Sequence, residues 1–302
     1  MLKTGRFEGV ASIQIDRTRC DLCGRCVTVC KGGPLYVTEG SIGIDQSRFF
    51  GCTGCGHCMA VCRKDAITVE GRDISRADLM DLPETGVRST FDELLSLMVS
   101  RRSIREFEDR EIPRPRTDTI IQAASTAPMG IPPSDVELLV LHGRQKVREF
   151  SDDMIAVMRR SRFILSPLSL ALMRPFIGRD AYTFMKTFTV PLISTIIDNR
   201  DEGNDWLLYG APLAIIFHIC PGADPADTLI AATYAMLAAE SQGLGGCMIG
   251  SVGPYLRHGG RRIRKKYGIP PENRVGITMV LGYPKVRFVR AIRRRFSKVL
   301  FY

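Results

Sequence analysis

The order of apolar and polar segments predicts two regions of different architecture. In the N-terminal region, Ile15-Asp16 leads into one glycine- and cysteine-rich stretch, and Ile44-Asp45 leads into another. This repetition predicts the order strand, loop, short helix, strand twice over. The stretch Leu82-Pro83-Glu84-Thr85-Gly86 has the composition of a linker. We therefore expect a small domain over residues 1–82, a linker over 83–89 and a larger domain over 90–302.

The larger region alternates helical and extended patterns. Thr90-Phe91-Asp92-Glu93 has the form of a capping box, after which Leu94, Leu95 and Met98 share one helical face. A later helix is marked by Asp224 as N-cap, Pro225 at its first position and Gly243 as its stop signal. The other expected elements are a helix near 116–125, a strand near 136–141, helices within 144–197, and strands at 212–219, after 243 and at 276–281. This order predicts an α+β domain built in layers.

The composition is that of a protein with a substantial core. Of its 302 residues, 45% are apolar and 25% are charged. No charge-free apolar run approaches the roughly 18 residues of a membrane span, and the longest is broken by Ser166, Pro167 and Ser169. The first twenty residues lack the apolar core of a secretory signal. We therefore expect a cytoplasmic protein with no membrane partner.

The positive charge is concentrated near the C-terminus. The net charge is +10, and residues 255–302 contain fourteen Lys and Arg against one acidic residue, Glu272. Nucleic acid is one class of partner for such a segment, but the basic residues have no aromatic interleaving and belong to no recognisable nucleic-acid module. We therefore favour phosphate binding within a site, or an acidic protein partner, and expect no nucleic acid.

Eight of the ten cysteines form two motifs of equal spacing, Cys20-x2-Cys23-x2-Cys26-x3-Cys30 and Cys52-x2-Cys55-x2-Cys58-x3-Cys62. This is the spacing of bacterial two-cluster ferredoxins. Three thiolates at two-residue gaps fit one face of an iron–sulfur cluster, and the fourth begins a helical turn that points toward the other cluster. We therefore expect two [4Fe–4S] clusters, one held by Cys20, Cys23, Cys26 and Cys62, and the other by Cys52, Cys55, Cys58 and Cys30.

Zinc is the alternative metal for these thiols, although zinc sites usually pair two C-x2-C knuckles. A proline usually follows the fourth cysteine of the ferredoxin motif, whereas Lys31 and Arg63 follow it here. Because that proline is not a ligand, we expect a changed potential or geometry and not the loss of a cluster. Cys220 and Cys247 lie outside both motifs, and we expect both to be buried core thiols.

Arg101, Arg102, Ser103 and Arg105 form a compact group of charge-assisted donors at the end of the first helix of the larger region. Such a group suits a phosphate. A solvated basic helix end that interacts with its own helix dipole is the other reading. The segment alone does not decide between the two.

Four segments of the larger region resemble, in order, landmarks of the nitroreductase family. They are Arg101-Arg102-Ser103-Ile104-Arg105-Glu106-Phe107, Tyr209-Gly210-Ala211-Pro212, Gly243-Leu244-Gly245 with Ile249-Gly250, and Leu281-Gly282-Tyr283-Pro284. The resemblance covers residues 90–302 and implies a sandwich with a central, mainly antiparallel sheet flanked by helices. It also implies FMN as cofactor and an intertwined homodimer. Fusion of a ferredoxin module to such a domain is a recognised branch of the family.

The resemblance also implies which residues contact the flavin. Arg101, Arg102, Ser103 and Arg105 would hold its phosphate and ribityl chain, and the backbone of Ile249, Gly250 and Ser251 would line its ring. Arg290 and Arg294 are the expected basic residues that complete the phosphate site. The family's Asn near the flavin is missing from Ala127–Ser134, so Ser134 or backbone amides are expected to replace it.

These expectations define an FMN-dependent oxidoreductase that passes electrons from a low-potential donor through two clusters to FMN and on to a small organic acceptor. No dinucleotide fingerprint follows a strand, so reduced ferredoxin or flavodoxin is favoured over NAD(P)H as donor. Nitroaromatics, quinones and activated alkenes are all candidate acceptors, and no catalytic side chain is identified. Two alternatives stay open: a flavin dehydrogenase that runs in the opposite direction, and a non-enzymatic electron-transfer or redox-sensing protein.

Overall fold

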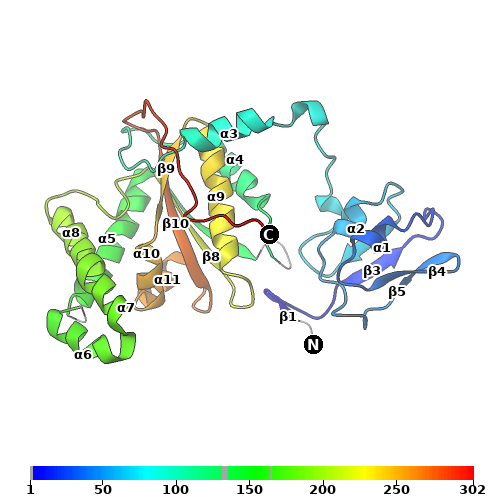
Figure 1. Ribbon diagram of the computed structural model, residues 1–302, viewed down its shortest axis with the longest axis horizontal. Coiled ribbons are helices and arrows are strands. Elements are labelled where there is room, and N and C mark those ends of the chain that lie inside the picture. Colours follow the sequence, from blue (N-terminus) through cyan, green and yellow to red (C-terminus); the bar gives the residue numbers. More distant parts are fainter. Residues whose placement is uncertain (1–2, 131–134, 164) are drawn as a thin grey trace. The chain divides into compact units, whose positions relative to one another are not determined.

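The computed structural model describes residues 3–130, 135–163 and 165–302. They form two compact units (Figure 1). The first unit contains the chain up to Arg88 together with two later segments, Pro128–Glu137 and Ile219–Asp227. The second contains Ser89–Ala127, Leu138–His218 and Thr228–Tyr302. The division after Arg88 lies at the end of the expected linker, whereas the two later segments come from within the expected larger domain.

The first unit is built from the predicted repeat. β3 (Ser12–Ile15), α1 (Arg25–Val29) and β4 (Leu35–Thr38) are followed by β5 (Ser41–Ile44), α2 (His57–Ala60) and β6 (Ile67–Glu70). β3 pairs antiparallel with β6, with Ile13 opposite Val69, and β4 pairs antiparallel with β5. Ala11, Met59 and Ile67 are buried between them. Strand, loop, short helix and strand therefore occur twice, as the sequence predicts.

A short N-terminal hairpin, β1 (Lys3–Thr4) with β2 (Phe7–Glu8), joins the later segments to this unit. At its turn, the Gly5 amide donates to the Gly222 carbonyl at 3.3 Å, and the Arg6 amide donates to Asp135 Oδ1 at 3.4 Å. Asp135 is 3% exposed, and burial raises the pKa of its carboxyl. A Cβ on Gly5, which has φ +58°, would lie 1.5 Å from Asp135 Oδ2. The turn therefore accepts only glycine.

Replacing Gly5 by alanine is expected to lower the free energy of unfolding by about 2–4 kcal/mol, from the left-handed backbone and the steric clash together. Gly9 is the matched control, because it also has a positive φ (+81°) but open space around a built Cβ. Gly9→Ala should therefore cost only about 1 kcal/mol. Denaturant unfolding of both variants measures the difference. Equal losses would show that Asp135 does not crowd the turn.

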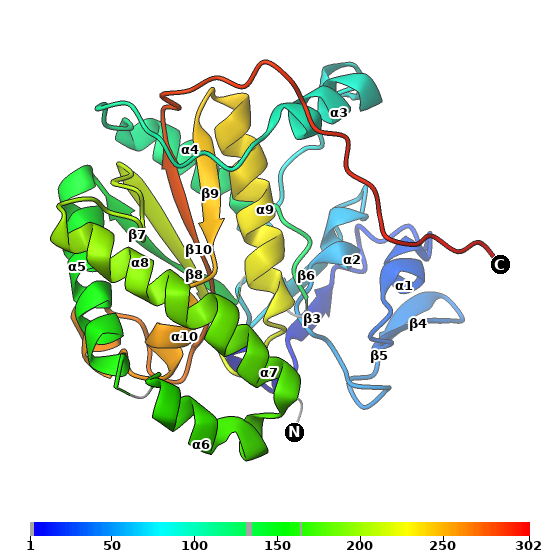
Figure 2. The ribbon, with the colours of Figure 1, turned by 60° about the vertical axis from the view of Figure 1, so that its left-hand side comes forward.

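The second unit contains most of a four-stranded sheet of order β7-β8-β10-β9. Its strands are β7 (Val136–His142), β8 (Leu213–Ile219), β9 (Gly245–Ile249) and β10 (Arg274–Gly282), which confirm the strands expected from the sequence. β10 and β9 are antiparallel, with Val280 opposite Cys247. All seven residues of β8 are buried. The expected α+β architecture, with a sheet flanked by helices, is confirmed (Figure 2).

The helices of this unit are α3 (Phe91–Ser100), α4 (Arg114–Ser125), α5 (Arg144–Ser161), α6 (Pro167–Ile177), α7 (Arg179–Phe184), α8 (Val190–Asp201), α9 (Ala226–Ser241), α10 (Val252–Arg257) and α11 (Arg261–Tyr267). The first seven follow the predicted order, whereas α10 and α11 lie where the sequence pattern predicted no helix. Phe150 and Met154 of α5 and Ile197 of α8 share a core with Ile216 of β8. α9 packs on β10 so closely that a Cβ on Gly276 would lie 1.9 Å from Thr228 Oγ1. The helices thus fix the ends of the strands, where the candidate site lies.

Several apolar surfaces of this unit are not covered by the described residues. α3 begins with the predicted capping box between Thr90 and Glu93, yet none of its residues is buried. The segment after β10 has no helix and, beyond the first residues, no strand, and its apolar side chains are exposed. The large exposed side chains of both segments are Phe91, Leu94, Leu95, Met98, Val99, Val286, Phe288, Val289, Ile292, Phe296, Val299, Leu300, Phe301 and Tyr302.

Among the helices of the described residues, none combines the length and the apolar character needed to cross a membrane.

Candidate cofactor sites

The first cysteine set surrounds a small cavity in the first unit. α1 begins after Gly24, whose left-handed backbone (φ 70°) turns the chain so that the cysteine loop leads directly into the helix. The cavity is lined by Cys20, Cys23, Cys26 and Cys62, with Ile42 and Ile67 among its apolar walls. The Ala66 amide donates a hydrogen bond to Cys62 Sγ at 3.3 Å. These four thiols are the group that the crossed pairing predicts for one cluster.

The second cysteine set is more deeply buried. Cys52 is 9% exposed and Cys58 is 7% exposed. Burial, and after it the neighbouring thiols Cys52, Cys55 and Cys30, raise the pKa of the Cys58 thiol to about 12. In the first set, the thiols that raise the pKa of Cys26, after burial, are Cys20 and Cys62. The electrostatic neighbours therefore divide into the same two groups of four that the spacing predicts.

The chemistry of these donors fits iron–sulfur clusters. Each group consists of four thiols and no nitrogen or carboxylate ligand, which is the donor set of a [4Fe–4S] cluster. Thiols this buried bind metal only as thiolates, so the iron would offset the cost of burying their charge. Within residues 3–130, 135–163 and 165–302 no group of three or more His, Cys, Asp or Glu side chains is arranged to hold a single metal ion.

The arginine motif crosses the edge of the sheet in the second unit. Ser103 forms a parallel bridge with Gly246 of β9, and the Ile104 amide donates to the Gly246 carbonyl at 3.0 Å. Ile104 packs against Gly245, where a Cβ would lie 2.3 Å from its Cγ1. This close contact explains the glycine at position 245, which lets the motif lie directly on the strand.

Arg102 is the most informative residue of the motif. It is 9% exposed, and its Nη2 is buried without a hydrogen-bond partner among the described residues. Arg101 is half-buried and its Nη1 contacts Met236 Sδ at 3.4 Å, while Ser103 and Arg105 are exposed. A buried guanidinium is costly unless an anion neutralises it. The motif therefore fits a phosphate better than it fits a solvated helix end.

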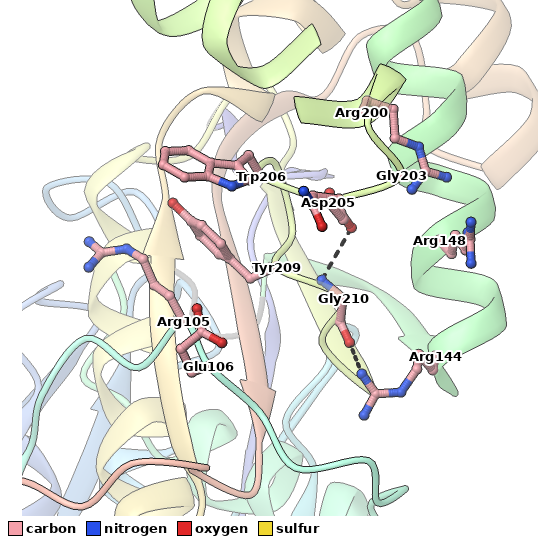
Figure 3. Close-up of a pocket in the computed structure, with 11 residues that line it drawn as sticks. Arg105, Glu106, Arg144, Arg148, Arg200, Gly203, Asp205, Trp206, Tyr209 and Gly210 are labelled. Atoms are coloured by element: carbon pink, nitrogen blue, oxygen red, sulfur yellow. Dashed lines mark hydrogen bonds between the residues drawn. The ribbon is translucent and has the colours of Figure 1, made fainter. Parts of the chain in front are cut away.

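Arg105 lines a cavity of about 670 Å³ in the second unit (Figure 3). Arg105, Trp206 and Tyr209 lie on one side of it, and Arg144, Arg148 and Arg200 lie on the other. The Arg105 guanidinium carbon lies 5.8 Å from the centre of the Tyr209 ring. Burial raises the pKa of Tyr209. The cavity thus combines aromatic surface with an excess of positive charge, which suits an aromatic ligand that carries negative charge.

Asp205 organises the loop that carries Tyr209. Its Oδ1 accepts hydrogen bonds from Ser151 Oγ at 2.8 Å and from the amides of Leu207 and Leu208, and its Oδ2 accepts from the Gly210 amide. Arg144 Nη1 donates to the Gly210 carbonyl. These bonds hold Tyr209 in a left-handed conformation, with φ 57°. The sequence pattern did not single out Asp205, Arg144 or Trp206. Of the three, Asp205 is of a residue type that favours turns, because an Asp side chain can accept a hydrogen bond from the backbone amide two residues later.

Arg102 lines a second cavity, of about 370 Å³, together with Gly243–Gly245, Tyr283 and Pro284. Two further arginines lie at this cavity, Arg110 and Arg287. Arg290 and Arg294, the basic residues expected from the sequence, are exposed and are not among the residues that line it. The chain after Pro284 has no regular repeat, so sequence spacing could not rank its arginines.

The other residues expected to contact the flavin do not line the Arg102 cavity or lie outside the described residues. Ile249 ends β9 and is buried, Gly250 is exposed, and Ser251 precedes α10. Ser134 lies outside the residues that the structure describes. Cys220 and Cys247 are buried core thiols, as expected. His218 is buried and pairs with Asn273 at 2.9 Å, which leaves it no evident acid–base role.

Comparison with known proteins identifies both halves of the chain. The nitroreductase family model matches residues 98–283, and a 4Fe–4S binding domain model matches residues 12–34, which contain the first cysteine motif. Comparison with curated proteins finds no significant match.

Two solved structures share the fold of the larger region. A nitroreductase with bound FMN from Bacteroides fragilis is 18% identical, with TM-score 0.51, over 70% of this chain and 98% of its own. A nitroreductase with bound FMN from Desulfitobacterium hafniense is 20% identical, with TM-score 0.50, over 70% of this chain and 99% of its own. The family model covers more than half of the chain. The chain therefore belongs to the nitroreductase family of flavin-dependent oxidoreductases and carries an N-terminal ferredoxin-type 4Fe–4S domain.

Proposed function

We propose that the chain binds two [4Fe–4S] clusters and one FMN, and that it reduces a small organic acceptor with electrons from a low-potential carrier protein. Two groups of four thiols support two clusters: Cys20, Cys23, Cys26 with Cys62, and Cys52, Cys55, Cys58 with Cys30. When bound, the clusters supply one-electron transfer, and FMN couples single electrons to two-electron chemistry at the acceptor.

The observation that carries the flavin assignment is the buried, unpartnered Nη2 of Arg102. In our proposal Arg102 neutralises the FMN phosphate, with Arg101 and Ser103 beside it in the motif. Arg287 is the residue of the C-terminal segment that we assign to the phosphate, because it lies at the Arg102 cavity and Arg290 and Arg294 do not. The backbone of Ile249–Ser251 is proposed to lie against the flavin ring.

Arg105 has a separate role in this proposal. It faces the larger cavity with Tyr209, at the other end of the motif from Arg101. A guanidinium at this position stabilises negative charge that develops on a reduced ring system. The Arg144 and Asp205 bonds hold the Tyr209 loop in place, so that the aromatic wall of the cavity is formed before a ligand enters. The acceptor would therefore meet a preformed pocket with a cationic wall.

The remaining parts of the proposal concern partners. The exposed apolar residues of α3 and of the C-terminal segment support a homodimer, because unpaired patches of this kind are usually covered by a partner subunit. Reduced ferredoxin or flavodoxin is the proposed electron donor, because the chain is basic and such carriers are acidic. The proposed location of the reaction is the cytoplasm.

Anaerobic rapid mixing with reduced ferredoxin tests this function. The proposal predicts bleaching of the cluster absorbance first, then of the flavin absorbance, and reoxidation of both when a nitroaromatic is added. Oxidation of an added substrate with electrons leaving through the clusters would instead identify a dehydrogenase. Cluster reduction with no flavin signal, even after FMN is supplied, would identify an electron-transfer protein without this enzymatic role.

A further inference from the structure

The two cysteine sets have different surroundings, and this difference bears on where electrons enter. Resting on the function proposed above, we infer that an acidic one-electron carrier protein docks on the face of the first set, with Leu22 as its apolar contact. One electron leaves the carrier and enters the module at this face, with no bond made or broken and no proton transferred. A cluster held by the second set would receive that electron, and this set lies on the side of the unit that holds the later segments.

Exposure distinguishes the two sets. Cys23 is exposed and Cys20, Cys26 and Cys62 are partly exposed, whereas Cys52 and Cys58 are buried. A Cβ on Gly24, at the end of the first loop, would meet nothing within 4 Å. In the second loop, Arg72 covers Gly54 and Ile74 covers Gly56, with built Cβ contacts of 2.7 Å and 2.9 Å. A carrier protein can therefore approach the first set closely and the second set only through other side chains.

The cover of the second set leads to the later segments of the same unit. Arg72, which packs over Gly54, donates to Thr4 Oγ1 at 2.7 Å and to the Gly9 carbonyl. The hairpin that carries Thr4 and Gly9 is the one that holds Asp135 and Gly222. The second set therefore lies near the part of the unit contributed by Pro128–Glu137 and Ile219–Asp227, and the first set is left for an external partner.

Leu22 has a left-handed backbone conformation that is unusual for a residue with its side chain. Its φ is 58°, and its side chain is 47% exposed. The equivalent position in the second motif is Gly54, with φ 76°. A leucine in this region costs roughly 1–2 kcal/mol that glycine avoids. Its neighbours Asp21 and Cys23 line the cavity of the first set. An exposed, strained leucine beside an electron-transfer centre points to a contact made with another molecule.

The rim around Leu22 is basic. The Asp16 amide donates to the Ala66 carbonyl at 2.7 Å, which joins the turn before the first motif to the residues after Cys62. Within the described residues, Arg17, Arg25 and Arg63 of this surface form no ion pair, and Lys64, two residues after Cys62, is exposed. Asp16 and Asp21 accept hydrogen bonds from Thr18 and Cys23, and Asp65 is paired with Arg19 and Arg76. The four basic side chains of Arg17, Arg25, Arg63 and Lys64 outnumber the carboxylates of Asp16 and Asp21, so the rim has net positive charge, which suits an acidic protein.

Leu22→Gly and Lys64→Glu test the inference with an acidic two-cluster ferredoxin as the probe. We expect Leu22→Gly to weaken binding of the ferredoxin about tenfold, as for an apolar interface anchor. Lys64→Glu should slow association severalfold at low ionic strength and flatten its dependence on salt. Two control variants that also introduce a glutamate should bind within about twofold of wild type: His57→Glu, at the place in the second motif that corresponds to Arg25, and Lys265→Glu, which is exposed on α11.

Folding and cluster content separate a docking role from a structural one. Leu22→Gly makes the first loop match the second, so its free energy of unfolding should be unchanged or higher. Its iron content and its EPR signal after equilibrium reduction should match those of the wild type. The inference is wrong if both variants bind ferredoxin as the wild-type protein does. It is also wrong if His57→Glu weakens ferredoxin binding more than they do. If the variants bind ferredoxin more weakly but the flavin of the wild-type protein is not reduced, the docking face is supported and the proposed function is contradicted.

Discussion

Replacing Cys58 by alanine is expected to halve the iron of the anaerobically purified protein, from about eight to about four per chain. Cys58 is 7% exposed and is surrounded by Cys30, Cys52 and Cys55. No water can take its place at this depth, so the cluster of the second set should be lost. Flavin content should not change, because the arginine motif belongs to the other unit. Iron and sulfide assays with flavin quantification make the measurement.

Cys220→Ala is the matched control for this prediction. Cys220 is 8% exposed, which is nearly the burial of Cys58, but it lies in neither thiol set. Its replacement should leave the iron content at the wild-type value. If Cys58→Ala keeps all its iron, or if both variants lose the same amount, the assignment of Cys58 as a ligand is wrong.

Arg102→Ala is expected to have two opposite effects. FMN affinity should fall at least about 30-fold, because removing one member of a buried charge pair costs about 2 kcal/mol or more. The flavin-free protein should be as stable as wild type or more stable, because the variant removes a buried cation whose Nη2 has no partner among the described residues. Flavin fluorescence titration and denaturant unfolding of the flavin-free protein measure the two effects.

The C-terminal arginines supply a matched pair for the same site. Arg287→Ala should weaken FMN binding severalfold, because Arg287 lies at the cavity of Arg102, while Arg294→Ala should leave it within about twofold. An Arg102→Ala protein that is less stable but binds FMN normally would make Arg102 a structural residue. If Arg294→Ala weakens FMN binding more than Arg287→Ala does, the phosphate contact is made by Arg294, as the sequence analysis expected.

Local chemistry explains which features could be predicted from the sequence. Cysteine spacing is set by the covalent chain, so the two sets of four follow from the spacing alone. The capping box at Thr90 and the signals around Asp224 are also local: α3 begins where they predict, and α9 begins one residue later, at Ala226. The short apolar run along 212–219 predicted β8 for the same reason.

Features that depend on distant contacts could not be predicted. The cavity of Arg105 is completed by Arg144, Arg200 and Asp205, which only the fold brings together. Nothing in the residues around Gly5 indicates that Asp135 will pack against it. Glycine is the usual residue in a left-handed conformation, as at Gly54 of the second motif. The leucine at the equivalent position of the first motif therefore gave no sign that Leu22 adopts the same conformation. The arginines after Pro284 lack a periodic pattern, so their spacing could not favour Arg287 over Arg290 and Arg294.

The most direct test of the account is the cofactor content of the protein purified without oxygen. Iron, acid-labile sulfide and released flavin should be measured per chain on the same sample. We predict about eight iron, about eight sulfide and about one FMN, which would place both clusters and the flavin in one polypeptide. About four iron with one FMN would contradict the second cluster. About eight iron with no flavin, and none taken up from added FMN, would contradict the flavin site at Arg102 and with it the proposed reduction of an organic acceptor.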